Sequence, residues 1–155
     1  MNFLSLFVLI PILTMGGLFL SKNLQQIRVA VATGASLLLA LAVGLVFAYL
    51  GERGAGNTAE MLFTADTVWY APLNIHYSVG VDGISVAMLL LSAVIVFTGT
   101  FASWKMDFLQ KEYFLWFNLL AIGVFGFFIS VDLFTMFMFY KLIITLQIIL
   151  RKVIL

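Results

Sequence analysis

The hydrophobic positions of this chain gather into five long runs instead of alternating regularly with polar positions. The runs cover residues 3–20, 29–50, 84–102, 113–131 and 133–150. Each holds about 18–22 residues, and at a rise of about 1.5 Å per residue such a helix crosses a hydrocarbon core of roughly 30 Å. Open sheets cannot satisfy their backbone in lipid, so each run is predicted to be a transmembrane helix. The expected fold class is an all-α polytopic membrane protein.

The longest connection, residues 51–81, has a different pattern. Its first residues are rich in glycine, whereas residues 67–79 alternate and are rich in aromatic and β-branched side chains. This alternation predicts a short outer β-hairpin between helices 2 and 3, turning at residues 72–74. Trp69 and Tyr70 are residue types that favour the headgroup level of a bilayer.

Composition agrees with the pattern of runs. Hydrophobic residues make up 64% of the chain and charged residues 10%, and the mean hydropathy is +1.17. A soluble globule of this size needs more polar surface, so the chain is expected to be an integral membrane protein forming a single membrane domain over residues 1–155.

The basic residues orient the predicted helices. Six of them fall in the connections after the first and third runs and in the tail: Lys22, Arg28, Lys105, Lys111, Arg151 and Lys152. On the opposite side the connections hold Arg53 alone. This asymmetry predicts an amino terminus outside and a carboxyl terminus in the cytoplasm. The basic residues form no stripe, so nucleic acid is not an expected partner.

Few residues offer catalytic or ligand chemistry. His76 is the one histidine and cysteine is absent, so no spacing typical of a metal, haem or iron–sulfur site is present. His76 is interpreted as an interfacial strand residue. No nucleophile–base pair or phosphate cradle occurs, and the chain is expected to bind no cofactor and to hold no redox site of its own.

Two charged residues draw attention. Lys141 lies near the middle of the last run, where a charge is costly and is by default a functional-site hypothesis. Its alternative interpretation is a lysine at a bundle interface that carries no proton. Asp82 directly precedes the third run, where an aspartate can accept backbone N–H bonds, and it is predicted to be a structural helix cap.

Several segments together resemble a known family. They are residues 69–72, 75–85, 103–105, 112–114 and 127–140. They resemble the amino-terminal part of subunit M, the chain-4 type, antiporter-like subunit of proton-pumping NADH–quinone oxidoreductase (respiratory complex I). The resemblance covers about residues 1–140 and is most specific at Gly80–Ser85 and in the segment after Asp132.

The resemblance implies a subunit of about fourteen helices in inverted repeats, with protons passing along charged residues in broken helices. Asp132 matches an acid of the family and is a candidate for the proton path as well as a cap. Lys141 stands where the family has a glutamate, and the family's downstream Leu-x-Pro-Met-like stretch is missing. We therefore expect residues 141–155 to be an atypical tail produced by a changed reading frame.

The interpretation that follows is a truncated subunit M fragment, with about five of the family's helices, that does not pump protons alone. Its expected partners are other antiporter-like membrane-arm subunits of complex I and the lipid bilayer, in the cell inner membrane. NADH, FMN, iron–sulfur clusters and quinone would belong to partner subunits. Two alternatives stay open: a subunit of a multisubunit cation/proton antiporter, and a small membrane scaffold without transport activity.

Overall fold

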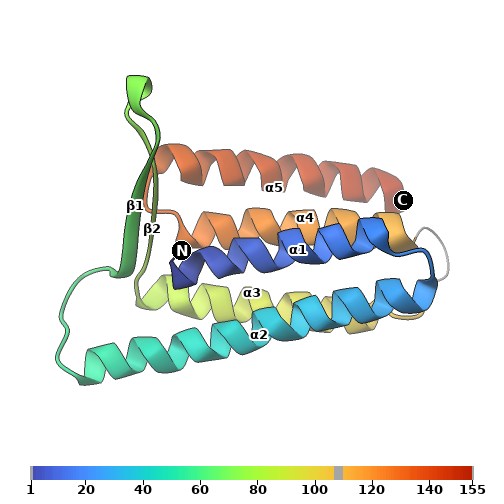
Figure 1. Cartoon of the computed structure of the whole chain (residues 1–155), viewed down its shortest axis with the longest axis horizontal. Helices are drawn as coiled ribbons and strands as arrows, with labels where there is room; N and C mark the ends of the chain where they lie inside the picture. Colours follow the sequence, from blue (N-terminus) through green and yellow to red (C-terminus); the bar gives the residue numbers. More distant parts are fainter. Residues whose placement is uncertain (1, 107–109, 155) are drawn as a thin grey trace.

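Five long helices and one β-hairpin make up the structure (Figure 1). The computed structural model describes residues 2–106 and 110–154. The helices are α1 (Leu6–Leu20, preceded by a 3-10 turn at Phe3–Ser5), α2 (Leu24–Gly54), α3 (Gly83–Ala102), α4 (Gln110–Ile129) and α5 (Leu133–Ile154), and the strands are β1 (Leu62–Tyr70) and β2 (Ile75–Val81). The expected fold class is confirmed, since all five helices are long and apolar enough to cross a membrane.

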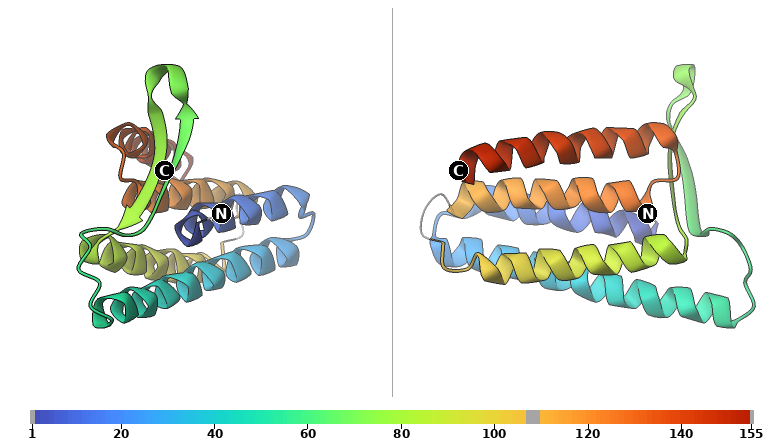
Figure 2. Two further views of the ribbon diagram at one scale, coloured as in Figure 1. Left: turned by 60° about the vertical axis from the view of Figure 1, so that its left-hand side comes forward. Right: turned by 180° about the vertical axis from the view of Figure 1, so that it is seen from behind.

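Four of the helices form a closed ring. Contacts run from α1 to α2, from α2 to α3, from α3 to α4, and from α4 back to α1. α5 lies outside this ring and packs on α4 and on β2 (Figures 1 and 2). Its principal helical neighbour is therefore α4 alone.

α2 is longer than its apolar run suggests. It begins five residues before position 29 and continues to Gly54. Gln25 and Gln26 are good helix formers, and no proline interrupts the chain on either side, so the helix continues beyond the apolar stretch. It ends where the chain turns at Gly56, whose φ of +89° suits glycine.

The hairpin lies across one end of the helices instead of continuing their direction (Figure 1). β1 and β2 pair antiparallel, with Asp66 opposite Ser78 and Val68 opposite His76. Pro72 lies in a short 3-10 turn and Asn74 closes it at φ 52°, a left-handed conformation that asparagine tolerates. The amino terminus lies at this end of the molecule, which we call the hairpin end, and the carboxyl terminus at the other.

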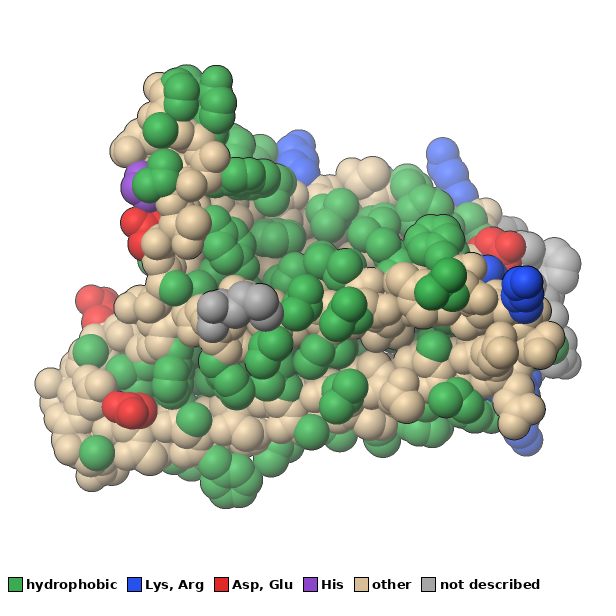
Figure 3. All heavy atoms as spheres, viewed as in Figure 1, with side chains coloured by type: hydrophobic (Ala, Val, Ile, Leu, Met, Phe, Trp, Pro, Cys, Tyr) green, Lys and Arg blue, Asp and Glu red, His purple; other side chains and the backbone are tan. Residues whose placement is uncertain are grey.

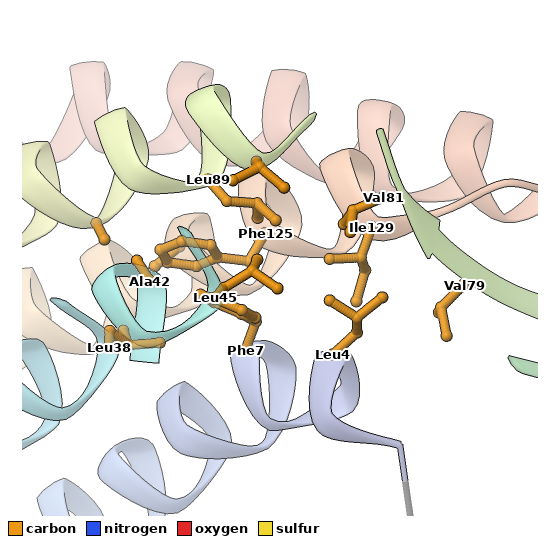
Figure 4. Packing of buried hydrophobic residues seen from close by; sticks show 13 residues of the cluster. Leu4, Phe7, Leu38, Ala42, Leu45, Val79, Val81, Leu89, Phe125 and Ile129 are labelled. Atoms are coloured by element: carbon orange, nitrogen blue, oxygen red, sulfur yellow. The ribbon is translucent and has the colours of Figure 1, made fainter. Parts of the chain in front are cut away.

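The main core lies inside the ring, near the hairpin end. Its buried residues include Leu4, Phe7, Leu38, Ala42, Leu45, Val79, Val81, Leu89, Phe125 and Ile129 (Figure 4). The Phe7 and Phe125 rings are 5.5 Å apart between centroids. Lipid tails are as apolar as these side chains, so close packing and not the hydrophobic effect holds the ring together.

Several polar contacts attach the hairpin to the bundle, and one of them is the hydrogen bond that Thr135 Oγ1 of α5 donates to His76 O at 3.3 Å. Val131 N donates to Ser78 O at 3.0 Å, and Val79 and Ser130 form an isolated β-bridge. Asn2 Nδ2 donates to Phe63 O at 2.7 Å on the other strand. β2 is thus held by the α4–α5 connection, and β1 by the start of the chain.

Candidate functional site

Lys141 lies on the exposed side of α5, eight residues after the helix begins. Its Nζ is 5.5 Å from the centroid of the Phe137 ring, one turn closer to the hairpin end. Such a cation–π contact contributes about 0.5–2 kcal/mol, whereas a lysine at a helix centre in a membrane costs roughly 2.5–3.5 kcal/mol. The contact with Phe137 therefore offsets only part of the cost of placing this charge.

Asp132 directly precedes α5 at the hairpin end. Its Oδ2 accepts hydrogen bonds from Phe134 N at 3.1 Å and Thr135 N at 3.3 Å. These are backbone donors that the first turn of a helix leaves unsatisfied. Lys141 lies nine residues further on, about 13 Å along the axis, so the structure does not bring the two proton-path candidates together. Their suggested roles in proton movement remain predictions.

Asp82 is the N-cap residue of α3. Its Oδ1 accepts a hydrogen bond from Ser85 N at 2.7 Å. This backbone bond is the largest cause that lowers the pKa of Asp82 below its ordinary value of 3.8, because it stabilises the ionised carboxylate. The geometry is that of a helix cap, and the side chain precedes the apolar helix Gly83–Ala102.

A second polar group, which sequence reasoning did not find, lies on the hairpin. Ser78 Oγ donates to Asp66 Oδ1, and His76 Nδ1 lies 2.9 Å from Asp66 Oδ2. His76 Nε2 is 2.9 Å from Asn74 Oδ1. The Ser78 hydroxyl is the largest cause that lowers the pKa of the Asp66 carboxyl below 3.8, and His76 acts in the same direction. Asp66 lies opposite Ser78 only in the register that the strands adopt, and the alternating segment of residues 67–79 did not include Asp66.

The interior of the bundle is polar only through uncharged side chains. The buried polar residues of the described chain are Thr14, Ser21, Ser92, Thr100, Gln110, Asn118, Ser130 and Thr135. Within the helices they bond mostly to carbonyls of their own turns, as Asn118 Nδ2 does to Phe114 O at 3.0 Å. Across residues 2–106 and 110–154, no buried ionisable side chain is available to relay a proton between the ring helices.

No metal centre is found in the part of the chain that the structure describes: nowhere do three His, Cys, Asp or Glu side chains come together.

The basic end of the molecule, opposite the hairpin, contains most of the lysine and arginine side chains visible in Figure 3. There Lys111 Nζ donates to Ser21 O at 3.0 Å and to Phe19 O at 3.3 Å. It thereby satisfies carbonyls at the end of α1, as cations near helix carboxyl ends commonly do.

Comparison with known proteins supports the sequence-based resemblance. The chain is 30% identical to F(420)H(2) dehydrogenase subunit M of Methanosarcina mazei over 141 residues, which is 89% of this chain and 27% of that protein. It is 27% identical to NADH-quinone oxidoreductase subunit M of Buchnera aphidicola over 148 residues, covering 90% of this chain and 29% of that protein. The resemblance to subunit M is confirmed.

Chain 4 proteins are similar too. NAD(P)H-quinone oxidoreductase chain 4 of Mesostigma viride is 27% identical over 111 residues, which is 72% of this chain and 21% of that protein. No family profile matches the sequence. The chain spans less than a third of the length of these subunit M and chain 4 relatives. It is thus a multi-pass membrane chain that is similar to subunit M over most of its own length.

Proposed function

We propose that this chain is a fragment of the proton-translocating membrane-arm subunit M of NADH–quinone oxidoreductase, whose full-length parent couples quinone reduction to proton pumping. The observation that carries the proposal is the similarity to subunit M proteins over 89–90% of this chain. The five apolar helices fit a membrane-arm component. The partners would be other membrane-arm subunits, and the redox cofactors would lie in further subunits.

The fragment by itself is proposed to assemble but not to pump. Proton paths through membranes use ionisable side chains that face a bundle interior or a water-filled cavity. The buried polar residues of the described chain are all uncharged, and Lys141 faces outward from α5. A path would therefore need residues that other segments supply, such as the broken helices that transporters place at the midplane.

We infer that this part of the molecule does not select the electron donor. One similar protein is named for F(420)H(2), another for NADH and a third for NAD(P)H. A membrane chain with similar sequence thus accompanies three different donors. This supports a role in the membrane arm, away from the site of donor oxidation.

The proposed orientation of the chain in the membrane rests on the position of its basic residues. The connections and tail that hold six basic residues lie opposite the hairpin (Figures 1 and 3). Positively charged connections stay in the cytoplasm. The hairpin and the amino terminus would then face outward from the cell inner membrane, and the carboxyl terminus would face the cytoplasm.

Copurification tests the proposal. The chain, tagged at its carboxyl terminus, is expressed in its native host and extracted in mild detergent. Recovery of peripheral redox subunits supports the complex I assignment. Recovery of antiporter subunits would replace it with a cation/proton antiporter, and recovery of the chain alone would favour a scaffold. In liposomes, the purified chain is expected to show no proton flux above that of empty vesicles.

A further inference from the structure

The outward side of α5 is an apolar surface with one charge at its centre. We call the exposed residues Phe137, Met138, Tyr140, Lys141, Ile144 and Ile148 the Lys141 face. Each ring helix contacts at least two other helices, whereas α4 is the principal helical neighbour of α5. Figure 2 shows α5 at the edge of the bundle in both views. Phe127 of α4 reaches the edge of this face at Tyr140, with the ring centroids 6.4 Å apart, and all six residues remain exposed.

The depth of Lys141 separates it from ordinary interfacial lysines. It lies about 12 Å from the hairpin end of α5 and about 15 Å from Arg151, both by the rise of the helix. Lysines near helix ends reach water with their long side chains. Here the ammonium lies over Phe137, which is itself a turn inside the helix. The charge is therefore held within the apolar span.

No acid within residues 2–106 and 110–154 is placed to neutralise that charge. The acidic residues that the structure describes all lie in connections or near helix ends: Glu52, Glu60, Asp66, Asp82, Glu112 and Asp132. The single ion pair of the described residues is His76 with Asp66, on the hairpin. A compensating carboxylate must come from outside the described chain.

Two other occupants of the face fit less well. Lipid tails would cover the apolar residues but offer Lys141 no hydrogen-bond acceptor. A second copy related by a two-fold axis along the membrane normal would bring two Lys141 side chains together at the same depth, where like charges repel. A helix with a carboxylate satisfies both requirements, because it supplies apolar contact and an opposite charge.

We propose that the Lys141 face binds a partner transmembrane helix that carries one carboxylate side chain at the depth of Lys141. An open groove beside the lysine, lined by Met138, Leu142 and Thr145, provides the space for that side chain. Thr145 Oγ1 is already bonded to Lys141 O at 2.9 Å, which leaves the ammonium as the group that recognises the acid. This inference depends on the geometry of α5 and not on the proposed redox complex.

The test measures helix association in lipid vesicles. The full chain carries a fluorophore on Asn57→Cys, which is a unique site because the chain has no cysteine. The probe is a synthetic leucine–alanine transmembrane peptide with one glutamate about 12 Å from the matching end, and its control has glutamine there. Energy transfer should show the glutamate peptide binding at least tenfold more tightly than the glutamine peptide. Equal binding of the two peptides would overturn the proposal.

Three variants test whether the preference for the glutamate peptide arises from the Lys141 face. Lys141→Met keeps the apolar surface and should remove the preference for glutamate, while Lys141→Glu should instead prefer a lysine-bearing peptide. The matched control combines Lys141→Met with Leu91→Lys, which moves the cation to the exposed side of α3, where Leu91 is 54% exposed. If that variant binds the glutamate peptide as well as the unaltered chain does, the face is not specific and the proposal fails. Self-association that excludes the peptide would also overturn it.

Discussion

At the scale of single residues, the aspartates near the hairpin end mainly satisfy backbone and hydroxyl donors. Asp82 and Asp132 each accept from backbone N–H groups of the helix that follows. Asp66 accepts from Ser78 across the hairpin. The role of Asp82 could be predicted because a cap depends on local sequence alone. The Asp66 group depends on strand register, and residue-by-residue reasoning missed it.

The first prediction concerns the cap of α3. Asp82→Ala should lower the free energy of unfolding by about 0.5–2 kcal/mol, because the Ser85 amide loses its acceptor. Unfolding of the purified chain in detergent by increasing sodium dodecyl sulfate, followed by circular dichroism, measures the change. Asp82→Ser is the matched control, since its hydroxyl can still accept the bond. If the alanine change in a stable, full-length parent blocks proton movement instead, Asp82 has a mechanistic role.

The second prediction is a pH dependence of the hairpin. The pKa of Asp66 is lowered in the folded chain, so its ionised form stabilises the hairpin. That contribution is fully present above the unfolded pKa of about 3.8 and is lost as the pH falls through the folded value. Hydrogen exchange of the β1 and β2 amides should accelerate relative to a pH-independent reference as the pH falls below 3.8. In Asp66→Asn, the β1 and β2 amides should show the weaker protection against exchange at every pH. If this variant keeps the pH profile of the unaltered chain, the assignment to Asp66 is contradicted.

At the scale of elements, α5 is held to the ring through close approach to α4. Gly126 faces the Phe139 ring so closely that a Cβ there would overlap it, and Gly123 lies against Ile143. Small residues let membrane helices approach in this way. The apolar runs predicted that α4 and α5 exist, but a run does not say which glycine meets which ring. The arrangement of ring and outer helix therefore could not be derived from the pattern of runs.

The third prediction follows from this contact. Gly126→Val should push Phe139 away and destabilise the α4–α5 packing by about 1–3 kcal/mol, which is the usual range for overpacking. Limited proteolysis at the α5 segment in detergent, compared with unaltered chain, reports the loosening. Gly44→Val is the matched control, because a Cβ at Gly44 meets no atom within 4 Å. Equal effects of the two changes would show that helix propensity, and not packing, is responsible.

At the scale of the whole molecule, charge and topology agree. The five helices place the amino terminus and the hairpin at one end and the carboxyl terminus at the other (Figure 1). The sequence predicted this polarity from basic residues in short connections. It did not predict that four helices close into a ring, because contacts between α1 and α4 join segments about a hundred residues apart and leave no local signal.

The fourth prediction tests the orientation in the membrane. Asn57→Cys, in the connection at the hairpin end, should react with a membrane-impermeant maleimide added to intact spheroplasts. Lys105→Cys, in the connection at the basic end, should react only after the membrane is opened. Both positions are exposed, so access and not burial decides the outcome. Labelling of Asn57→Cys from the cytoplasmic side alone would reverse the proposed topology.

The closed ring has a consequence for the order in which the protein forms during synthesis. α1 is made well before α4, and it finds one of its two helical neighbours only when α4 has been made. Until then, one flank of α1 stays exposed to lipid or to the insertion machinery. Once Ile129 has entered the bilayer, the ring can close before α5 exists. β2, however, forms its backbone contacts with Ser130 and Val131 only after those residues have been made. The hairpin therefore reaches its final position after the ring has closed, although its strands are made earlier.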